Sequence, residues 1–579
     1  MADTGIEPSS RAGKRILAVV AVLILLAAGF YWWSHAGANT SVAGSSPKHF
    51  VEAEEAGYSN VRAADYVGAS ACEECHQERY TQWSGNLHRK MNRLVSEEGA
   101  VLGDFANRRI KYGAKTLVLE QEGNDYWMSF EESGKVVRRY RVTRTIGSRY
   151  LQEYVGIQVV GPEASGDSAY ETEIRLPFGY LLGMKRWLHQ QYFDSWHDRE
   201  YSGESMTHDP FEPDKTPWRS RCAWCHNTYP FENRLARMQG DEKVGSGIEQ
   251  LFSDLREDQR EPAERLLLDT EKLVSVGISC ESCHFGAREH VENGAKIRFA
   301  PQAPSVVAVA DVPALSGERT DNRSINAICA QCHSVPTLLY PNGAGTRNSS
   351  EALDLLVGNC ASEIKCTDCH DPHVPGPGAM SEDSPKHIAA CTGCHEKYAD
   401  AGEAAFHSLH GPEVSCLDCH MPRITQGLAS LIRSHRISSP DDLLMLQSGL
   451  NACNLCHLDK SVAWTVNELA VSRGVRLPGM LSESKPWPEQ ASALWWLESE
   501  ERILRLTAAG ALGMSPNGRE YLGTLLRLLG DPNAYDRLRY MWAIEGILRR
   551  ELTPQEYDVS APPEVRKRQA AALWAKENS

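Results

Sequence analysis

The chain lacks several features that would assign it to common protein classes. No cysteine precedes Cys72 or follows Cys456, and only Cys360 lies outside one repeated motif. The total of 17 cysteines is odd, whereas a disulfide framework predicts an even number. A basic excess is also missing, because the formal net charge is −15, and this excludes nucleic acid as a partner. Long apolar runs are absent except at residues 16–33, so the sequence predicts a single membrane span at most.

What the chain does contain is Cys-x-x-Cys followed at once by His, repeated so that it uses 16 of the 17 cysteines. In chain order the eight copies are Cys72, Cys75 and His76; Cys222, Cys225 and His226; Cys280, Cys283 and His284; Cys329, Cys332 and His333; Cys366, Cys369 and His370; Cys391, Cys394 and His395; Cys416, Cys419 and His420; and Cys453, Cys456 and His457. This motif attaches a c-type haem, because thiols one helical turn apart reach the porphyrin edge while the adjacent imidazole binds iron. Zinc sites and redox dithiols also use paired cysteines, but neither needs histidine at the next position. The sequence therefore predicts eight c-type haems.

The apolar run at residues 16–33 follows Arg11, Lys14 and Arg15 and ends in aromatic residues. We expect residues 1–15 to be cytoplasmic, residues 16–33 to be a single transmembrane anchor, and the remainder to lie in the periplasm or another extracytoplasmic space. Haem attachment to such motifs takes place on that outer face. A cleaved signal peptide is the alternative, because residues 36–38 read Ala-Gly-Ala.

The rest of the chain divides by composition. Residues 34–65 are small, polar and charged, as in a linker, and residues 66–460 form the haem domain. We expect this domain to be mainly α with much irregular structure, and to contain a small antiparallel β insertion at about 108–160. The insertion is interpreted as a flap over the first haem or as a wall of a substrate cavity. Residues 461–579 contain no cysteine and predict a helical, HEAT-like tail, which caps the last haems or docks another subunit.

Each iron that only transfers electrons needs a sixth ligand, and the chain has 20 histidines, of which eight are proximal. His35 and His49 lie in or beside the tether. Ten candidates remain for distal ligation: His88, His189, His197, His208, His290, His373, His387, His407, His410 and His435. We favour His88, His290, His373 and His435, and expect one of His407 and His410 to bind iron with the other beside it. Cys360 is interpreted as a small buried apolar residue.

Three segments carry a family resemblance. They are Tyr66-Val67-Gly68 with the first motif, Tyr80, Trp83 and His88; the third motif with His290; and the seventh motif with Met421-Pro422-Arg423 and Arg433-Ser434-His435. They resemble multihaem cytochromes of the hydroxylamine oxidoreductase and octahaem tetrathionate reductase superfamily. The resemblance implies that His88, His290 and His435 are distal ligands. Phe285 stands where that family usually has glycine, and the Cys-x-x-Cys-Lys motif of its reductases is absent.

Two functions fit these observations. The first is a membrane-anchored electron-transfer protein with mostly bis-histidine haems, served by redox partner proteins or placed within a larger respiratory complex. The alternative is an oxidoreductase acting on a small nitrogen or sulfur compound at one five-coordinate haem.

Overall fold

The computed structural model describes residues 59–112, 115–190, 192, 218, 223–231, 233, 273–297, 299, 301, 322–335, 337–374, 385–477, 480–482 and 485–578. By its contacts the chain separates into residues 1–57 and 58–579, and all of the described residues belong to the second unit. The predicted cytoplasmic segment, transmembrane anchor and most of the linker lie outside the described residues, as do Cys222, His197 and His208. In the ranges that are described, no helix is long and apolar enough to cross a bilayer.

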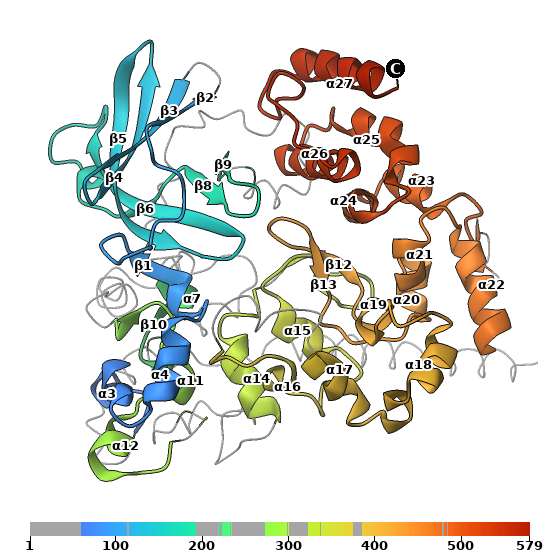
Figure 1. The fold of residues 1–579 in the computed structure, drawn as a ribbon, viewed down its shortest axis with the longest axis horizontal. Coiled ribbons are helices and arrows are strands. Elements are labelled where there is room, and N and C mark those ends of the chain that lie inside the picture. Colours follow the sequence, from blue (N-terminus) through green and yellow to red (C-terminus); the bar gives the residue numbers. More distant parts are fainter. Residues whose placement is uncertain are drawn as a thin grey trace, which may run out of the picture. The chain divides into compact units, whose positions relative to one another are not determined.

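An antiparallel sheet of nine strands follows the first motif (Figure 1). Its strands are β1 (Asn92–Leu94), β2 (Arg108–Tyr112), β3 (Lys115–Glu122), β4 (Asp125–Glu132), β5 (Lys135–Ile146), β6 (Leu151–Val160), β7 (Ile174–Arg175), β8 (Phe178–Leu181) and β9 (Arg186–His189). The main order is β2-β3-β4-β5-β6-β8-β9, with β1 paired to β5 and β7 to β6. The sheet is larger than the predicted insertion at 108–160, because short strands extend it at both ends of that range.

The alternating pattern that predicted these strands places one set of side chains in a shared core. Leu117 pairs with Phe130 and Leu119 with Met128 across β3 and β4, and all four are fully buried. Residues opposite each other in a ladder point to the same face, so these four side chains lie on one side of the sheet. Gly123 closes the β3–β4 turn with φ +62°, a conformation that suits glycine.

The described attachment motifs lie on short helices. These are α3 (Ser70–Glu73), α7 (Ala223–His226), α11 (Glu281–His284), α14 (Asn322–Ala330), α16 (Cys366–Cys369), α17 (Pro385–Thr392), α19 (Cys416–His420) and α21 (Ala452–Cys456). Such short helices depend on their N-terminal caps. In α19 the Asp418 carboxylate accepts the backbone N–H of Ser415 at 2.8 Å, and in α16 Asp368 accepts that of Lys365 at 2.9 Å. An acidic residue inside the motif thus helps to form the helix that carries its thiols.

The tail is helical, as expected. It consists of α22 (Val462–Arg473), α23 (Ser492–Leu497), α24 (Arg502–Met514), α25 (Leu522–Leu528), α26 (Ala534–Leu548) and α27 (Pro563–Glu577), with a short β14–β15 hairpin (Met480–Ser482 and Lys485–Pro486) after α22. Helices α24 and α26 pack closely, because a Cβ at Gly546 would lie 2.5 Å from the Gly513 carbonyl oxygen. The same apolar core also contains Ile424 and Leu431 of the haem domain. The tail is therefore continuous with the end of that domain.

Candidate haem centres

The predicted attachment thiols are accessible or partly accessible wherever the structure describes them. Cys75, Cys394 and Cys456 are exposed. The partly buried ones are Cys72, Cys225, Cys280, Cys283, Cys329, Cys332, Cys366, Cys369, Cys391, Cys416, Cys419 and Cys453. None of them is joined to another described cysteine in a disulfide, so these pairs keep the thiols that covalent attachment uses.

The two thiols and the imidazole of a motif are not gathered around one point. Among the described residues, no group of three or more histidine, cysteine or acidic side chains is arranged to hold a metal ion directly. A c-type site does not require such a group, because its thiols bind the porphyrin edge and only the imidazole binds iron. Cysteines such as Cys225, Cys283 and Cys332 are therefore predicted attachment residues rather than metal ligands.

Thiols of different motifs lie side by side at two places. Cys280 of the third motif donates a hydrogen bond to Cys72 of the first, which lowers the pKa of Cys72 and raises that of Cys280. A similar hydrogen bond between the fourth and fifth motifs joins Cys366 to Cys329 and raises the pKa of Cys366. Porphyrins attached to neighbouring thiols would themselves be neighbours.

Six of the eight proximal histidines lie opposite a histidine from another part of the chain. The ring centroids are 6.1 Å apart for His76 and His290, 6.5 Å for His333 and His88, 6.3 Å for His284 and His373, 6.2 Å for His370 and His435, 6.2 Å for His420 and His407, and 6.2 Å for His457 and His410. Metal–imidazole bonds of about 2 Å place two rings on opposite sides of one metal with centroids roughly 6 Å apart. The spacing in each pair therefore fits one iron between two imidazoles.

Hydrogen bonds hold several of these rings by the nitrogen that iron would not use. The Nδ1 of His290 lies 2.8 Å from the Ala295 carbonyl oxygen, that of His420 lies 2.9 Å from the Ser438 carbonyl, and that of His410 lies 2.7 Å from the Ser408 carbonyl. A carbonyl accepts only a hydrogen bond, so each Nδ1 donates and Nε2 keeps its lone pair. This arrangement is typical of metal-binding histidines, whose other nitrogen donates to a carbonyl or carboxylate.

Two rings instead contact carboxylates. His333 Nδ1 lies 3.1 Å from Glu351 Oε2, and His373 Nδ1 lies 3.3 Å from Asp371 Oδ1. The hydrogen bond to Glu351 raises the pKa of His333 to about 8. Burial acts to raise the pKa of Glu351, but the hydrogen bond and charge of His333 outweigh it and lower that pKa to about 2. Glu351 is therefore a carboxylate at neutral pH.

Other paired rings are kept neutral. Burial is the main cause that lowers the pKa of His284 to about 4, and the nearby rings of His373 and His76 add to it. Burial and the ring of His435 likewise lower the pKa of His370 to about 4. Because iron binds the neutral imidazole, both rings are in their ligating form at neutral pH.

The paired histidines connect different motifs. His88 follows the first motif and faces the fourth, whereas His290 follows the third motif and faces the first. His373 follows the fifth motif and faces the third, and His435 follows the seventh and faces the fifth. The segment after one motif therefore brings a histidine ring opposite the proximal histidine of another motif.

The attachment helices also form a series in space. Helix α11 contacts α14, α14 contacts α16, α16 contacts α17, α17 contacts α19, and α19 contacts α21. The first motif joins the third through Glu281, whose carboxylate accepts the backbone N–H groups of Val67 and Gly68 at 3.0 and 2.8 Å. Glu281 is buried and also accepts the N–H of Ala287 at 3.0 Å. The motifs from the third to the eighth thus follow one another without a break.

His226 and His395 differ from the other six proximal residues. Within the described ranges no histidine ring lies opposite either of them. His226 is partly buried, and burial lowers its pKa. Its helix α7 packs against the sheet, with Trp224 in a core that contains Ile146 and Val155. Among the described residues, the ring of Tyr398 lies 6.5 Å from that of His395.

The other predicted distal ligands that the structure describes are His189, His387, His407 and His410. His189 is buried in β9 with its ring 4.9 Å from that of Phe178, and His387 in α17 lies edge-on to His370 at 5.6 Å. His407 and His410 each face a different proximal histidine, whereas the sequence led us to expect only one of them at an iron. The physical reason is that α18 (Ala401–Ser408) ends in Leu409 with φ +62°, so the chain turns between the two rings.

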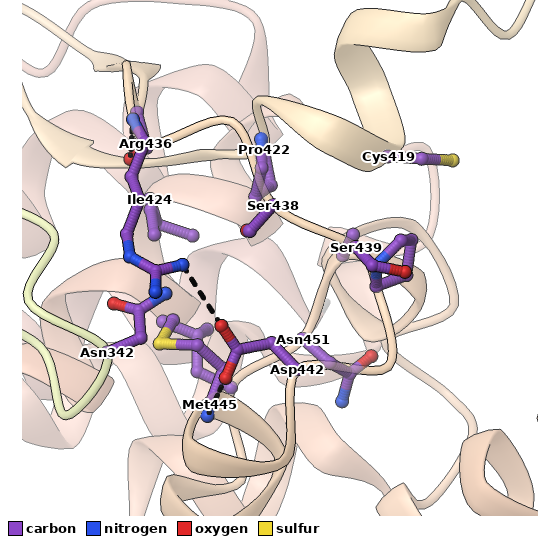
Figure 2. A pocket seen from close by; sticks show the side chains of 14 residues that line it. Asn342, Cys419, Pro422, Ile424, Arg436, Ser438, Ser439, Asp442, Met445 and Asn451 are labelled. Atoms are coloured by element: carbon purple, nitrogen blue, oxygen red, sulfur yellow. Dashed lines mark hydrogen bonds and ion pairs between the residues drawn. The ribbon is translucent and has the colours of Figure 1, made fainter. Parts of the chain in front are cut away.

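A pocket lies beside the seventh motif, with the Cys419 side chain at its rim (Figure 2). Arg436 and Asp442 form an ion pair of 3.1 Å across its wall. The Arg436 Nε is buried and has no hydrogen-bond partner among the described residues. A positively charged donor next to an attachment thiol suits the carboxylates of a haem.

Two cytochrome families match separate parts of the chain. The family described as cytochrome c554 and c-prime matches residues 71–113, and the family described as cytochrome c552 matches residues 403–470. The multiheme cytochrome MtrA of Shewanella baltica (strain OS185) is 27% identical over 158 residues. That alignment covers 27% of this chain and 38% of MtrA.

Two solved structures align with this chain. The outer cell wall cytochrome OcwA aligns with a TM-score of 0.40 and 15% identity, over 88% of this chain and 99% of its own. The octaheme sulfite reductase MccA of Wolinella succinogenes aligns with a TM-score of 0.29 and 13% identity, over 90% of this chain and 84% of its own. The chain is thus similar to c-type cytochromes at both ends of the cysteine-containing region, and the repeated attachment motif agrees with this similarity.

Proposed function

We propose that this protein is a membrane-anchored cytochrome that transfers electrons through eight c-type haems on the extracytoplasmic side. The observation that carries the proposal is the unbroken series of contacts among the attachment helices from α11 to α21. Electron tunnelling becomes rapidly slower with distance, so haems fixed to helices that touch one another form an efficient chain. Glu281 adds the first motif to this series.

The cysteines of the eight motifs would hold the porphyrins, and the eight proximal histidines would bind the irons. The ring spacings support His88, His290, His373, His407, His410 and His435 as distal ligands. His189, His197, His208 and His387 are the proposed sources of imidazole for the second and sixth irons. When bound, the haem supplies a reversible one-electron change at iron. The residues of this chain fix the rings and exclude water.

The surroundings of the haem domain are part of the same proposal. Residues 16–33 would anchor it in the cytoplasmic membrane, and a donor and an acceptor protein, or neighbouring subunits of a respiratory complex, would complete the pathway. We assign the chain to the hydroxylamine oxidoreductase and octahaem tetrathionate reductase superfamily on the three segments around His88, His290 and His435. The tail would be a HEAT-like surface for a partner.

The second candidate function is an oxidoreductase for a small nitrogen or sulfur compound. The observation in its favour is that neither His226 nor His395 faces a histidine in the described part of the chain. An iron without a sixth protein ligand can bind substrate directly. Of the two sites, His226 is the more enclosed, because it is partly buried next to the sheet whereas His395 is exposed.

Low-temperature electron paramagnetic resonance of the oxidised protein separates the two functions. Electron transfer alone predicts only low-spin signals, since every iron then has two imidazoles. An enzyme predicts a high-spin signal that changes when nitrite, hydroxylamine or sulfite is added. Appearance of that signal in the untreated protein would contradict electron transfer as the sole function.

A further inference from the structure

Glu351 is distinguished by the way it holds a proximal histidine. It begins α15 (Glu351–Leu356), and its Oε2 lies 3.1 Å from Nδ1 of His333, the proximal residue of the fourth motif. Its other carboxylate oxygen accepts the backbone N–H of Ser349 at 2.9 Å. The Ala352 N–H donates to the His333 carbonyl at 2.9 Å. Backbone hydrogen bonds thus hold both Glu351 and His333 in place.

The ring of His420, another proximal residue, donates through Nδ1 to the neutral Ser438 carbonyl. A carboxylate is a stronger acceptor than a carbonyl and carries a negative charge. It therefore makes the imidazole a stronger electron donor to a metal, and its charge stabilises the more positive oxidation state of that metal. Both effects favour ferric over ferrous iron and lower the reduction potential.

We propose that Glu351 is a positioning residue that lowers the reduction potential of the fourth haem. This inference rests on the proposed electron-transfer function. Helix α14 carries the first thiol of the fourth motif and contacts both α11 and α16. The reduction potential of a haem at this position affects how readily electrons pass between the third and fifth haems.

The geometry of the fourth site should also give its haem a resonance signal that can be distinguished from those of the other haems. The planes of His88 and His333 are inclined by 79°, whereas those of His407 and His420 are inclined by 3°. Nearly perpendicular imidazole planes leave two iron d orbitals close in energy, and this gives a strongly anisotropic low-spin resonance signal. The fourth haem can therefore be followed separately from sites with parallel rings.

The test is a redox titration of the full-length haem protein, monitored by electron paramagnetic resonance, for the wild type, Glu351→Gln, Glu351→Asp and Glu363→Gln. Glutamine keeps an oxygen acceptor but removes the charge, and aspartate keeps the charge on a shorter side chain. Glu363→Gln is the matched control, because this exposed carboxylate between the fourth and fifth motifs contacts Ser362 rather than a histidine.

We expect Glu351→Gln to raise the midpoint of the anisotropic signal, Glu351→Asp to raise it less, and Glu363→Gln to leave it unchanged. An unchanged midpoint in Glu351→Gln would overturn the inference, and so would an equal shift in the Glu363 control. Absence of the anisotropic signal from the wild type would overturn the His88–His333 pair and the inference with it. Electron transfer through the remaining haems, measured by full reduction with dithionite, tests the proposed function separately.

Discussion

At the scale of the residue, the separation of two imidazole rings is the observation that supports each proposed iron ligand. His407 and His410 lie three positions apart, yet each ring is 6.2 Å from a different proximal histidine. Sequence spacing could not distinguish one ligand from two here. The left-handed conformation of Leu409, which ends α18, sends the second ring toward the eighth motif.

This geometry predicts that both residues bind iron. His407→Ala and His410→Ala should each convert one of the low-spin haems to high spin, and the double variant should convert two. The measurement is quantitative electron paramagnetic resonance of the oxidised protein. Ala401→Ser, at the exposed start of the same helix, is the control and should change nothing. A high-spin signal in only one of the single variants would mean that the other histidine is not a ligand.

At the scale of the element, the end of α11 shows how a motif helix is closed. Phe285 follows the third motif with φ +55° and ψ −168°, a region that glycine alone adopts without strain. The side chain is buried, with its ring 5.2 Å from that of Phe231. Strain of roughly 1–3 kcal/mol is smaller than the roughly 3–5 kcal/mol of a buried aromatic ring, so packing holds the backbone in this conformation.

Two substitutions separate these contributions. Phe285→Gly loses the packing but relieves the strain, whereas Phe285→Ala loses the packing and keeps the strain. Both variants should be less stable than the wild type. The free energy of unfolding of the glycine variant should be higher than that of the alanine variant by about 1 kcal/mol. Urea denaturation followed by tryptophan fluorescence measures the difference. An alanine variant as stable as the glycine variant would show that the position is unstrained.

The elements themselves were predictable to different degrees. The alternation in β3 and β4 identified the centre of the sheet, because one face of each strand is buried. β8 could not be found in this way, since all four of its residues are buried and no alternation remains. The ligand pairs were the least predictable, because His88 and His333 meet only through tertiary packing. Sequence reasoning selected His88 from a family resemblance, and it had no means of naming its partner.

At the scale of the whole molecule, the tail and the haem domain share one core. The hydroxyl oxygens of Thr507 in α24 and Tyr340 are 3.2 Å apart and share a hydrogen bond. Arg539 of α26 donates a hydrogen bond to the Gly427 carbonyl at 2.9 Å. Within the tail, Asp536 is almost fully buried and accepts hydrogen bonds from Arg502 at 2.5 to 2.9 Å. The two regions should therefore unfold together.

Asp536→Ala tests this coupling. Removing one partner of a buried ion pair leaves the other charge uncompensated and costs about 3–5 kcal/mol. We expect the variant to unfold in a single transition at lower temperature, with no change in haem content. Calorimetry together with Soret absorbance measures both regions. Two separate transitions, of which only one shifts, would show that the tail is an independent domain.

The most direct test of the central claim is a count of covalently bound haem. The protein should be matured in a host that attaches c-type haem, and its haem content should be determined by intact mass and by the pyridine haemochrome spectrum. The account predicts eight haems that remain on the chain after denaturation, one for each Cys-x-x-Cys-His motif. Fewer than eight on the fully matured protein, or haem that is extracted by acid and organic solvent, would contradict it.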